Sequence, residues 1–106
     1  MTPTPLEKHA KQLGALGHPA RLQILRFVVQ GDPEGTSAGD IQGHVDIPAS
    51  TLSHHLRRLA AADLVSSRTQ GTFIFYRANY DALRALTTYL WEDCCKRGKA
   101  GSEECC

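Results

Sequence analysis

The chain has 106 residues, of which 42% are hydrophobic and 22% are charged. This length allows one hydrophobic core, and the composition is that of a folded globular domain, so the sequence excludes both a multidomain protein and a disordered one. No apolar run approaches the roughly 18 residues of a membrane helix. The polar start MTPTPLEKHAKQ carries no secretory signal, so we expect a cytoplasmic protein without a membrane partner.

The charge of the chain is unevenly distributed. The net charge is only +1, but residues 50–80 hold four arginines against a single aspartate. A nearly neutral chain with one basic segment is typical of a protein that has one docking face for an anionic partner, rather than of a general polycation.

Apolar residues at helical spacing predict four helices in the first 62 residues. We expect these helices at residues 6–16, 18–30, 37–45 and 49–62. Pro19 opens the second helix, a turn rich in Gly and Pro ends it, and Ser37 caps the third.

The periodicity changes to that of strands after Asp63. Residues 64–68 and 72–78 are rich in β-branched and aromatic side chains, which predicts two strands joined at Gln70-Gly71. Gly71 supplies the positive φ that a tight hairpin requires. Asn79 then caps a last helix. The predicted fold class is mainly α with a β-hairpin: four helices, a two-stranded hairpin and a C-terminal helix.

The fourth predicted helix has one apolar and one polar face. Its inward stripe is formed by Leu52, Leu56, Leu59 and Ala60. The candidate DNA-contacting residues face outward or lie on its flanks: Ser50, Thr51, Ser53, His54, Arg57 and Arg58. Such side chains bond phosphates and base edges in a major groove. A solvated polar face is the simpler alternative, but a basic hairpin follows at once, with Arg68 and Gln70 as further candidates, and this order indicates a winged helix-turn-helix.

His54 and His55 are adjacent, but neighbouring residues on a helix diverge by about 100°. A shared role as metal ligands is therefore disfavoured. We interpret His54 as a DNA-facing residue and His55, at the edge of the core, as a structural one.

Three separated stretches carry a family resemblance: LGALGHPARLQILRFV, STLSHHLRRLAAADLV and RTQGTFIFYRA. In this order they resemble the ArsR-SmtB family of bacterial metal-sensing repressors, over about residues 6–92. The resemblance implies a homodimeric winged helix-turn-helix protein that binds operator DNA without metal and leaves it when the inducer binds. It assigns the recognition helix to residues 49–62 and the wing to residues 64–78. We expect residues 1–93 to form this domain and residues 94–106 a flexible, cysteine-bearing tail.

The first and last helices resemble the dimer interface of that family. The leucine stripes of both helices agree with this assignment and give the candidate interface residues Leu6, Leu13, Leu16, Leu83, Leu86 and Leu90. A two-fold dimer predicts an operator that is an inverted repeat, with half-sites about one helical turn, or a multiple of it, apart.

All four cysteines lie in the last 13 residues: Cys94, Cys95, Cys105 and Cys106. This clustering does not suit a disulfide scaffold, and in a reducing cytoplasm such cysteines are free thiols available to soft metal ions or to redox chemistry. The family's other sites are absent, because SAGDIQGHV has no cysteine and YDALRALTTYLWED has no histidine. The CC-x9-CC pattern resembles arsenite-responsive members whose vicinal cysteines follow the last helix.

Trivalent arsenic and antimony bind three thiolates, so we predict As(III) or Sb(III) as the inducer. Cys94 and Cys95 supply two sulfurs, and either Cys105 or Cys106 supplies the third. Zinc, cadmium or lead held by all four thiolates is the main alternative, although the spacing is not that of structural zinc sites. A thiol redox switch of the same fold is the other alternative.

A thiol enzyme is the competing class of function. The cysteines follow the C-terminus of a helix, where the dipole disfavours a thiolate, and no loop cradles an anion. We therefore expect an arsenic-responsive transcriptional repressor with no catalytic residues and no organic cofactor.

Overall fold

A computed structural model describes residues 2–98 of the chain. The helices are α1 (Pro5–Leu16), α2 (Pro19–Gln30), α3 (Ala38–Val45), α4 (Ala49–Ala61) and α5 (Tyr80–Trp91), and the strands are β1 (Thr36–Ser37), β2 (Val65–Gln70) and β3 (Phe73–Ala78). All five predicted helices and the predicted hairpin are confirmed. None of the helices in this part of the chain is long and apolar enough to cross a membrane.

Side-chain caps fix where several helices begin. The Ser37 hydroxyl accepts the Asp40 N–H at 3.1 Å at the start of α3, and the Asn79 amide oxygen accepts the Ala82 N–H at 3.1 Å at the start of α5. Both caps were predicted, because each satisfies a backbone donor that the helix leaves free. At the start of α2, His18 Nδ1 accepts the Ala20 N–H at 3.2 Å.

The wing is the antiparallel hairpin of β2 and β3, with Val65 opposite Ala78 and Gln70 opposite Phe73. Its tight turn places Gly71 at φ 63°, the positive value predicted for it. The sequence missed β1, whose two residues pair with β3 and make the sheet three-stranded, in the order β1-β3-β2. Two residues are too short to show the periodicity of a strand.

The core lies where α2, α3 and α4 meet the base of the wing. Its most enclosed apolar side chains are Ile24, Ile41, Leu59 and Leu64. Leu52 and Leu56 are buried as predicted, but Ala60 is exposed, and His55 lies on the buried side of α4 instead. Ala60 was therefore wrongly assigned to the inward stripe.

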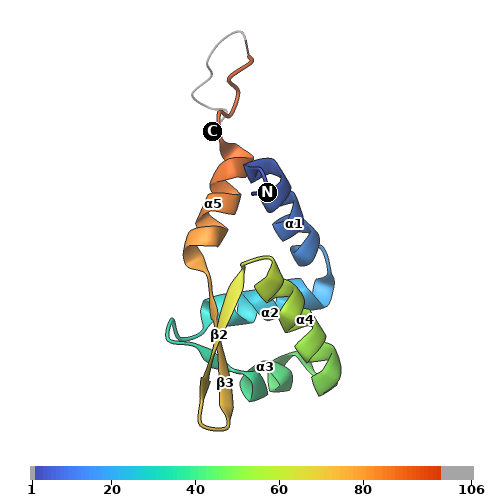
Figure 1. Ribbon diagram of the computed structural model, residues 1–106. Helices are drawn as coiled ribbons and strands as arrows, with labels where there is room; N and C mark the ends of the chain where they lie inside the picture. Colours follow the sequence, from blue (N-terminus) through green and yellow to red (C-terminus); the bar gives the residue numbers. More distant parts are fainter. Residues whose placement is uncertain (1, 99–106) are drawn as a thin grey trace.

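The molecule is elongated, with different elements at its two ends (Figure 1). Helices α1 and α5 lie at one end, and the wing points away at the other, beside α3. Helix α4 runs from α3 back towards α1. The arrangement keeps the two leucine-bearing helices apart from the tip of the wing.

Candidate nucleic-acid interface and cysteine site

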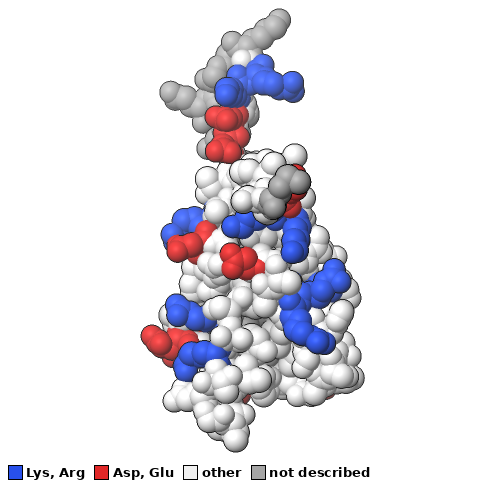
Figure 2. All heavy atoms as spheres, viewed as in Figure 1, with Lys and Arg blue, Asp and Glu red and all other residues white. Residues whose placement is uncertain are grey.

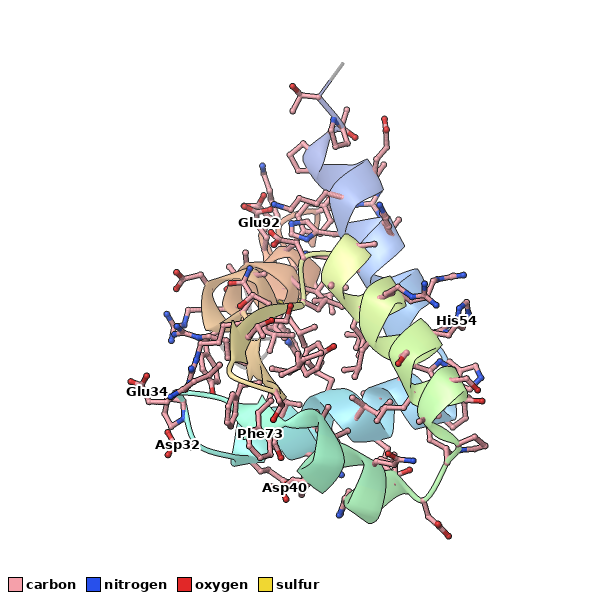
Figure 3. All side chains as sticks on the ribbon, turned by 60° about the horizontal axis from the view of Figure 1, so that its bottom comes forward. Asp32, Glu34, Asp40, His54, Phe73 and Glu92 are labelled. Atoms are coloured by element: carbon pink, nitrogen blue, oxygen red, sulfur yellow. The ribbon has the colours of Figure 1, made fainter. Side chains whose placement is uncertain are left out.

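Helix α4 presents a continuous polar face to solvent. All six of its candidate DNA-contacting residues are exposed: Ser50, Thr51, Ser53, His54, Arg57 and Arg58. Figure 3 shows His54 on the outer side of the helix, away from the core. The opposite side is anchored by three buried leucines, so the helix is held by its apolar stripe and can offer hydroxyl, imidazole and guanidinium groups to a partner.

Basic side chains gather along the flank of the molecule where α1 and α4 lie (Figure 2). Lys11 of α1 and Arg58 of α4 line the same surface hollow there. Within residues 2–98, the ion pairs join Asp81 to Arg84 and Asp93 to Lys96. The arginines of α4 thus keep their positive charge uncompensated by a carboxylate in this part of the chain, which favours an anionic partner.

Arg68 on the wing makes three contacts that the sequence did not predict. Arg68 Nη1 donates to Gln70 Oε1 at 2.7 Å, and Nη2 donates to the Glu34 carbonyl at 3.4 Å. Its guanidinium carbon lies 4.8 Å from the centre of the Phe75 ring, within the range of a cation–π interaction. Both Arg68 and Gln70 are exposed, and their mutual bond orients the arginine along the wing.

A buried polar pair lies behind the exposed polar face of α4, at the junction of α1, α2 and α4. Arg21 is 9% exposed and His55 is 6% exposed. Arg21 Nη1 donates to His55 Nδ1 at 3.4 Å. Burial, followed by the nearby His18 and Arg21, lowers the pKa of His55 below its usual value of 6.5. The sequence predicted a structural His55 at the edge of the core; the structure buries it more fully, and the sequence gave no signal for its partner.

A chain of polar contacts connects α5 with the end of α4. The Tyr89 ring lies 4.6 Å, centre to centre, from the ring of His9 on α1. His9 Nδ1 donates to Gln12 Oε1 at 2.9 Å, and Gln12 Nε2 donates to the Ala62 carbonyl at 3.2 Å. Gln12 is almost completely buried. The sequence does not predict this connection, because helical periodicity marks only the leucines of α1.

The cysteine pair lies on tight turns just after α5 rather than on the helix itself. Helix α5 ends at Trp91, and Asp93 and Cys95 have φ angles of 57° and 62°, in the left-handed region. This backbone brings the half-buried sulfurs of Cys94 and Cys95 to 3.8 Å from each other. Adjacent side chains on a helix would instead point about 100° apart.

Neither Cys94 nor Cys95 is a free thiol in the structure, contrary to the expectation for a reducing compartment. Cys105 and Cys106 lie outside the described residues. Within residues 2–98, no three His, Cys, Asp or Glu side chains are grouped so as to hold a metal ion.

The candidate dimer residues fall into two groups. Leu6, Leu13 and Leu90 are exposed, which is the position expected of residues that contact a second chain. Leu86 is buried within the chain, and Leu16 and Leu83 pack against the core. The helices α1 and α5 therefore keep exposed apolar side chains.

Comparisons with known proteins agree with this architecture. A family of helix-turn-helix domains matches residues 16–68. The chain is 31% identical over 101 residues to the arsenical resistance operon repressor of Bacillus subtilis, an alignment that covers 95% of this chain and 92% of that protein. The chain belongs to the ArsR–SmtB family.

Two further proteins similar to this chain are a transcriptional repressor and a homodimeric DNA-binding domain. The transcriptional repressor SdpR of B. subtilis is 37% identical over 70 residues, 66% of this chain and 74% of that protein. The homodimeric winged helix-turn-helix DNA-binding domain Mb0332 of Mycobacterium bovis matches with a TM-score of 0.67 and 25% identity, over 92% of this chain and 87% of that structure. Family membership accordingly supports the winged-helix assignment without naming the inducer.

Proposed function

We propose that this ArsR–SmtB family member is a homodimeric transcriptional repressor whose α4 and wing bind an inverted-repeat operator. The observation that carries the proposal is the exposed polar face of α4 beside a basic hairpin, on a helix held by buried leucines. We further propose that As(III) or Sb(III) releases the operator by binding to reduced cysteine thiolates after α5.

The dimer is supported by the exposed apolar surface of α1 and α5. Leu90 and Trp91 are 59% and 66% exposed, and Leu6 is 64% exposed. A second copy of the chain covers these side chains in the proposed assembly, as two-fold pairing of identical patches does in most homodimers. The homodimeric Mb0332 domain is consistent with that arrangement.

The inducer proposal is supported by the position of the first two sulfurs. Cys94 and Cys95 follow the helix that belongs to the proposed dimer surface, and their sulfurs lie 3.8 Å apart. Two thiolates at that separation can bond one thiophilic ion once both are reduced, since metal–sulfur bonds of about 2.3 Å span it. Cys105 or Cys106 supplies the third thiolate, and the arsenical repressor of B. subtilis is a relative over nearly the whole chain.

A thiol–disulfide switch is the second candidate. The specific observation in its favour is that neither Cys94 nor Cys95 is a free thiol in the structure. Oxidation would then do what the metalloid does in the first proposal, by fixing the chain that follows α5. Zinc, cadmium or lead remains the alternative ion for the same sulfurs.

The deciding experiment measures release from DNA. Reduced protein is titrated onto a labelled duplex from upstream of its own gene, and arsenite, zinc or peroxide is then added separately. Release by arsenite alone supports the metalloid repressor. Release by zinc or by peroxide would transfer the role of inducer to that agent, and failure to bind any such duplex would overturn the repressor proposal.

Substitutions then locate the sensor. We expect Cys94→Ser and Cys95→Ser to bind DNA as the unsubstituted chain does but to lose release by arsenite, because each removes one of three thiolates. Of Cys105→Ser and Cys106→Ser, only one is expected to lose the response. Normal release from the Cys94→Ser variant would contradict the proposed site.

A further inference from the structure

The Arg21–His55 pair requires a neutral imidazole. The Arg21 guanidinium has donors and no acceptor, so His55 Nδ1 must accept the hydrogen bond that joins them at 3.4 Å. This assigns the proton of the neutral ring to Nε2. A doubly protonated imidazole has no acceptor left, so one more proton removes the bond and places two cations against each other.

Arg21 is itself fixed by the backbone of α1. Its Nε donates to the Ala15 carbonyl at 2.6 Å, and its side chain is buried. The hydrogen bond to Ala15 and the burial of the side chain restrain the guanidinium, so it stays close to His55 when that ring becomes positively charged. The strain of protonation therefore falls on α4, which carries His55.

The titratable or charged side chains that lower the pKa of His55 are all histidines or arginines. From the start of α2 come Arg21 and His18, whose ring centre lies 4.7 Å from that of His55. From α4 itself come His54, with its ring centre at 5.9 Å, and Arg58. On helix α1, the Ala15 carbonyl accepts the hydrogen bond from Arg21 Nε. Within the described chain, no carboxylate forms a hydrogen bond or an ion pair with His55.

His55 also lies directly behind the face that is proposed to meet DNA. Its neighbours His54 and Arg58 are exposed on the outer side of α4. The leucines on either side, Leu52 and Leu56, hold the same helix through apolar contacts that do not depend on pH. A displacement of α4 at His55 consequently moves the outward side chains, whose positions base recognition requires.

We propose that the Arg21–His55 bond positions α4 for DNA, and that operator affinity falls when His55 takes up a proton. His55 is a positioning residue in this account, since it reaches DNA only through the helix. The inference rests on DNA binding by α4 and is independent of the inducer. The lowered pKa of His55 agrees with this proposal, because it means that the folded structure disfavours the protonated ring. The unfolded chain binds the proton more readily, so the free energy of unfolding falls as the pH drops below 6.5.

The first test compares operator affinity at about pH 8 and about pH 5.5, at constant ionic strength, by fluorescence anisotropy. We expect the dissociation constant to rise towards acid, by up to about tenfold per pH unit for each His55 that takes up a proton, and so by up to about 100-fold per pH unit for the two of the proposed dimer. His55→Asn keeps an acceptor for Arg21 but has nothing to protonate, so it should bind DNA well at the higher pH and lose this acid dependence. An unchanged pH profile in His55→Asn would overturn the proposal.

His54→Asn is the matched control. His54 is exposed on the DNA side, where a positive charge favours phosphate, so its own protonation strengthens binding. Removing it should leave the acid weakening in place or make it steeper. If His54→Asn instead abolishes the weakening, the pH dependence belongs to His54 and not to His55.

A second measurement needs no variant and covers the case in which His55→Asn fails to fold. Proton NMR of the imidazole rings gives the pKa of each histidine with and without the operator. We expect the pKa of His55 to fall on DNA binding. A rise at His55 would refute the positioning role, whereas absence of operator binding at every pH would refute the repressor proposal instead.

Discussion

Gln12 is a polar residue in the interior of the protein, because its primary amide is almost completely buried where α1 meets the end of α4. Both polar atoms of its side chain are used, one by His9 and one by the Ala62 carbonyl. A buried amide is tolerated only when it is paired in this way. Gln12 therefore fixes the distance between the end of the recognition helix and the helix pair that carries the proposed dimer surface.

We predict that Gln12→Leu lowers the free energy of unfolding by about 1–3 kcal/mol, since it leaves the buried Ala62 carbonyl without a donor. Urea denaturation measures the loss. Gln42→Leu is the matched control, because Gln42 Nε2 also donates to a backbone carbonyl, that of Ile47, but from a half-buried position. Equal losses in both variants would show that enclosure at Gln12 adds nothing.

The outward residues of α4 could be predicted from the sequence, but the pairs behind them could not. Leu52, Leu56 and His54 follow from the periodicity of a single helix, which is a local property. The bond between Arg21 and His55 and the bond between Gln12 and Ala62 join residues that lie far apart in the chain. Only the folded arrangement of α1, α2 and α4 brings these partners together.

At the scale of elements, the wing is a sheet that restrains its own arginine. Arg68 stacks on Phe75 and bonds to Gln70, so the charge is presented at a fixed place on the hairpin. A charge held in advance loses less side-chain entropy when it meets a phosphate. The wing thus offers an oriented cation, although its strands are mostly exposed.

We predict that Arg68→Ala weakens operator binding about equally for all sequences and reduces the slope of log affinity against log salt by about 2, because the proposed dimer loses one phosphate contact from each of its two wings. Arg84→Ala is the control, because Arg84 lies on α5 and pairs with Asp81. A titration series at several salt concentrations measures both slopes. A slope unchanged in Arg68→Ala would remove this arginine from the interface.

The elements themselves were predictable where a local signal marks them. Ser37 and Asn79 cap α3 and α5 as expected, and Gly71 takes the positive φ of the hairpin turn. The strand β1 has no such signal, since its pairing is decided by β3, much later in the chain. The turns that bring the sulfurs of Cys94 and Cys95 together were also beyond prediction, because Asp93 and Cys95 adopt positive φ angles, which are uncommon outside glycine.

At the scale of the whole molecule, a single chain leaves apolar side chains of α1 and α5 in water. Leu13 and Leu90 are among them, whereas Leu86 already belongs to the interior. The six leucines predicted from the two stripes thus divide by exposure, which helical periodicity alone does not reveal. The exposed members define where the proposed partner chain has to lie.

We predict that Leu13→Glu combined with Leu90→Glu gives a folded monomer, because four carboxylates would be brought together in the two-fold interface. Sedimentation measures the mass. The loss of paired binding should weaken affinity for an inverted repeat by about 100-fold or more. Leu22→Glu is the control, since Leu22 is exposed on α2. A double variant that remains dimeric would exclude this surface as the interface.

The short strand β1 connects the wing to the start of helix α3. Thr36 and Ser37 pair with Tyr76 and Phe75 of the wing, and Ser37 also caps α3. The hairpin of β2 and β3 therefore cannot be transferred to another protein as an independent unit. A graft of residues 65–78 into a related regulator would have to bring this dipeptide with it, or the transplanted wing would lose both its third strand and its fixed angle to the helix-turn-helix.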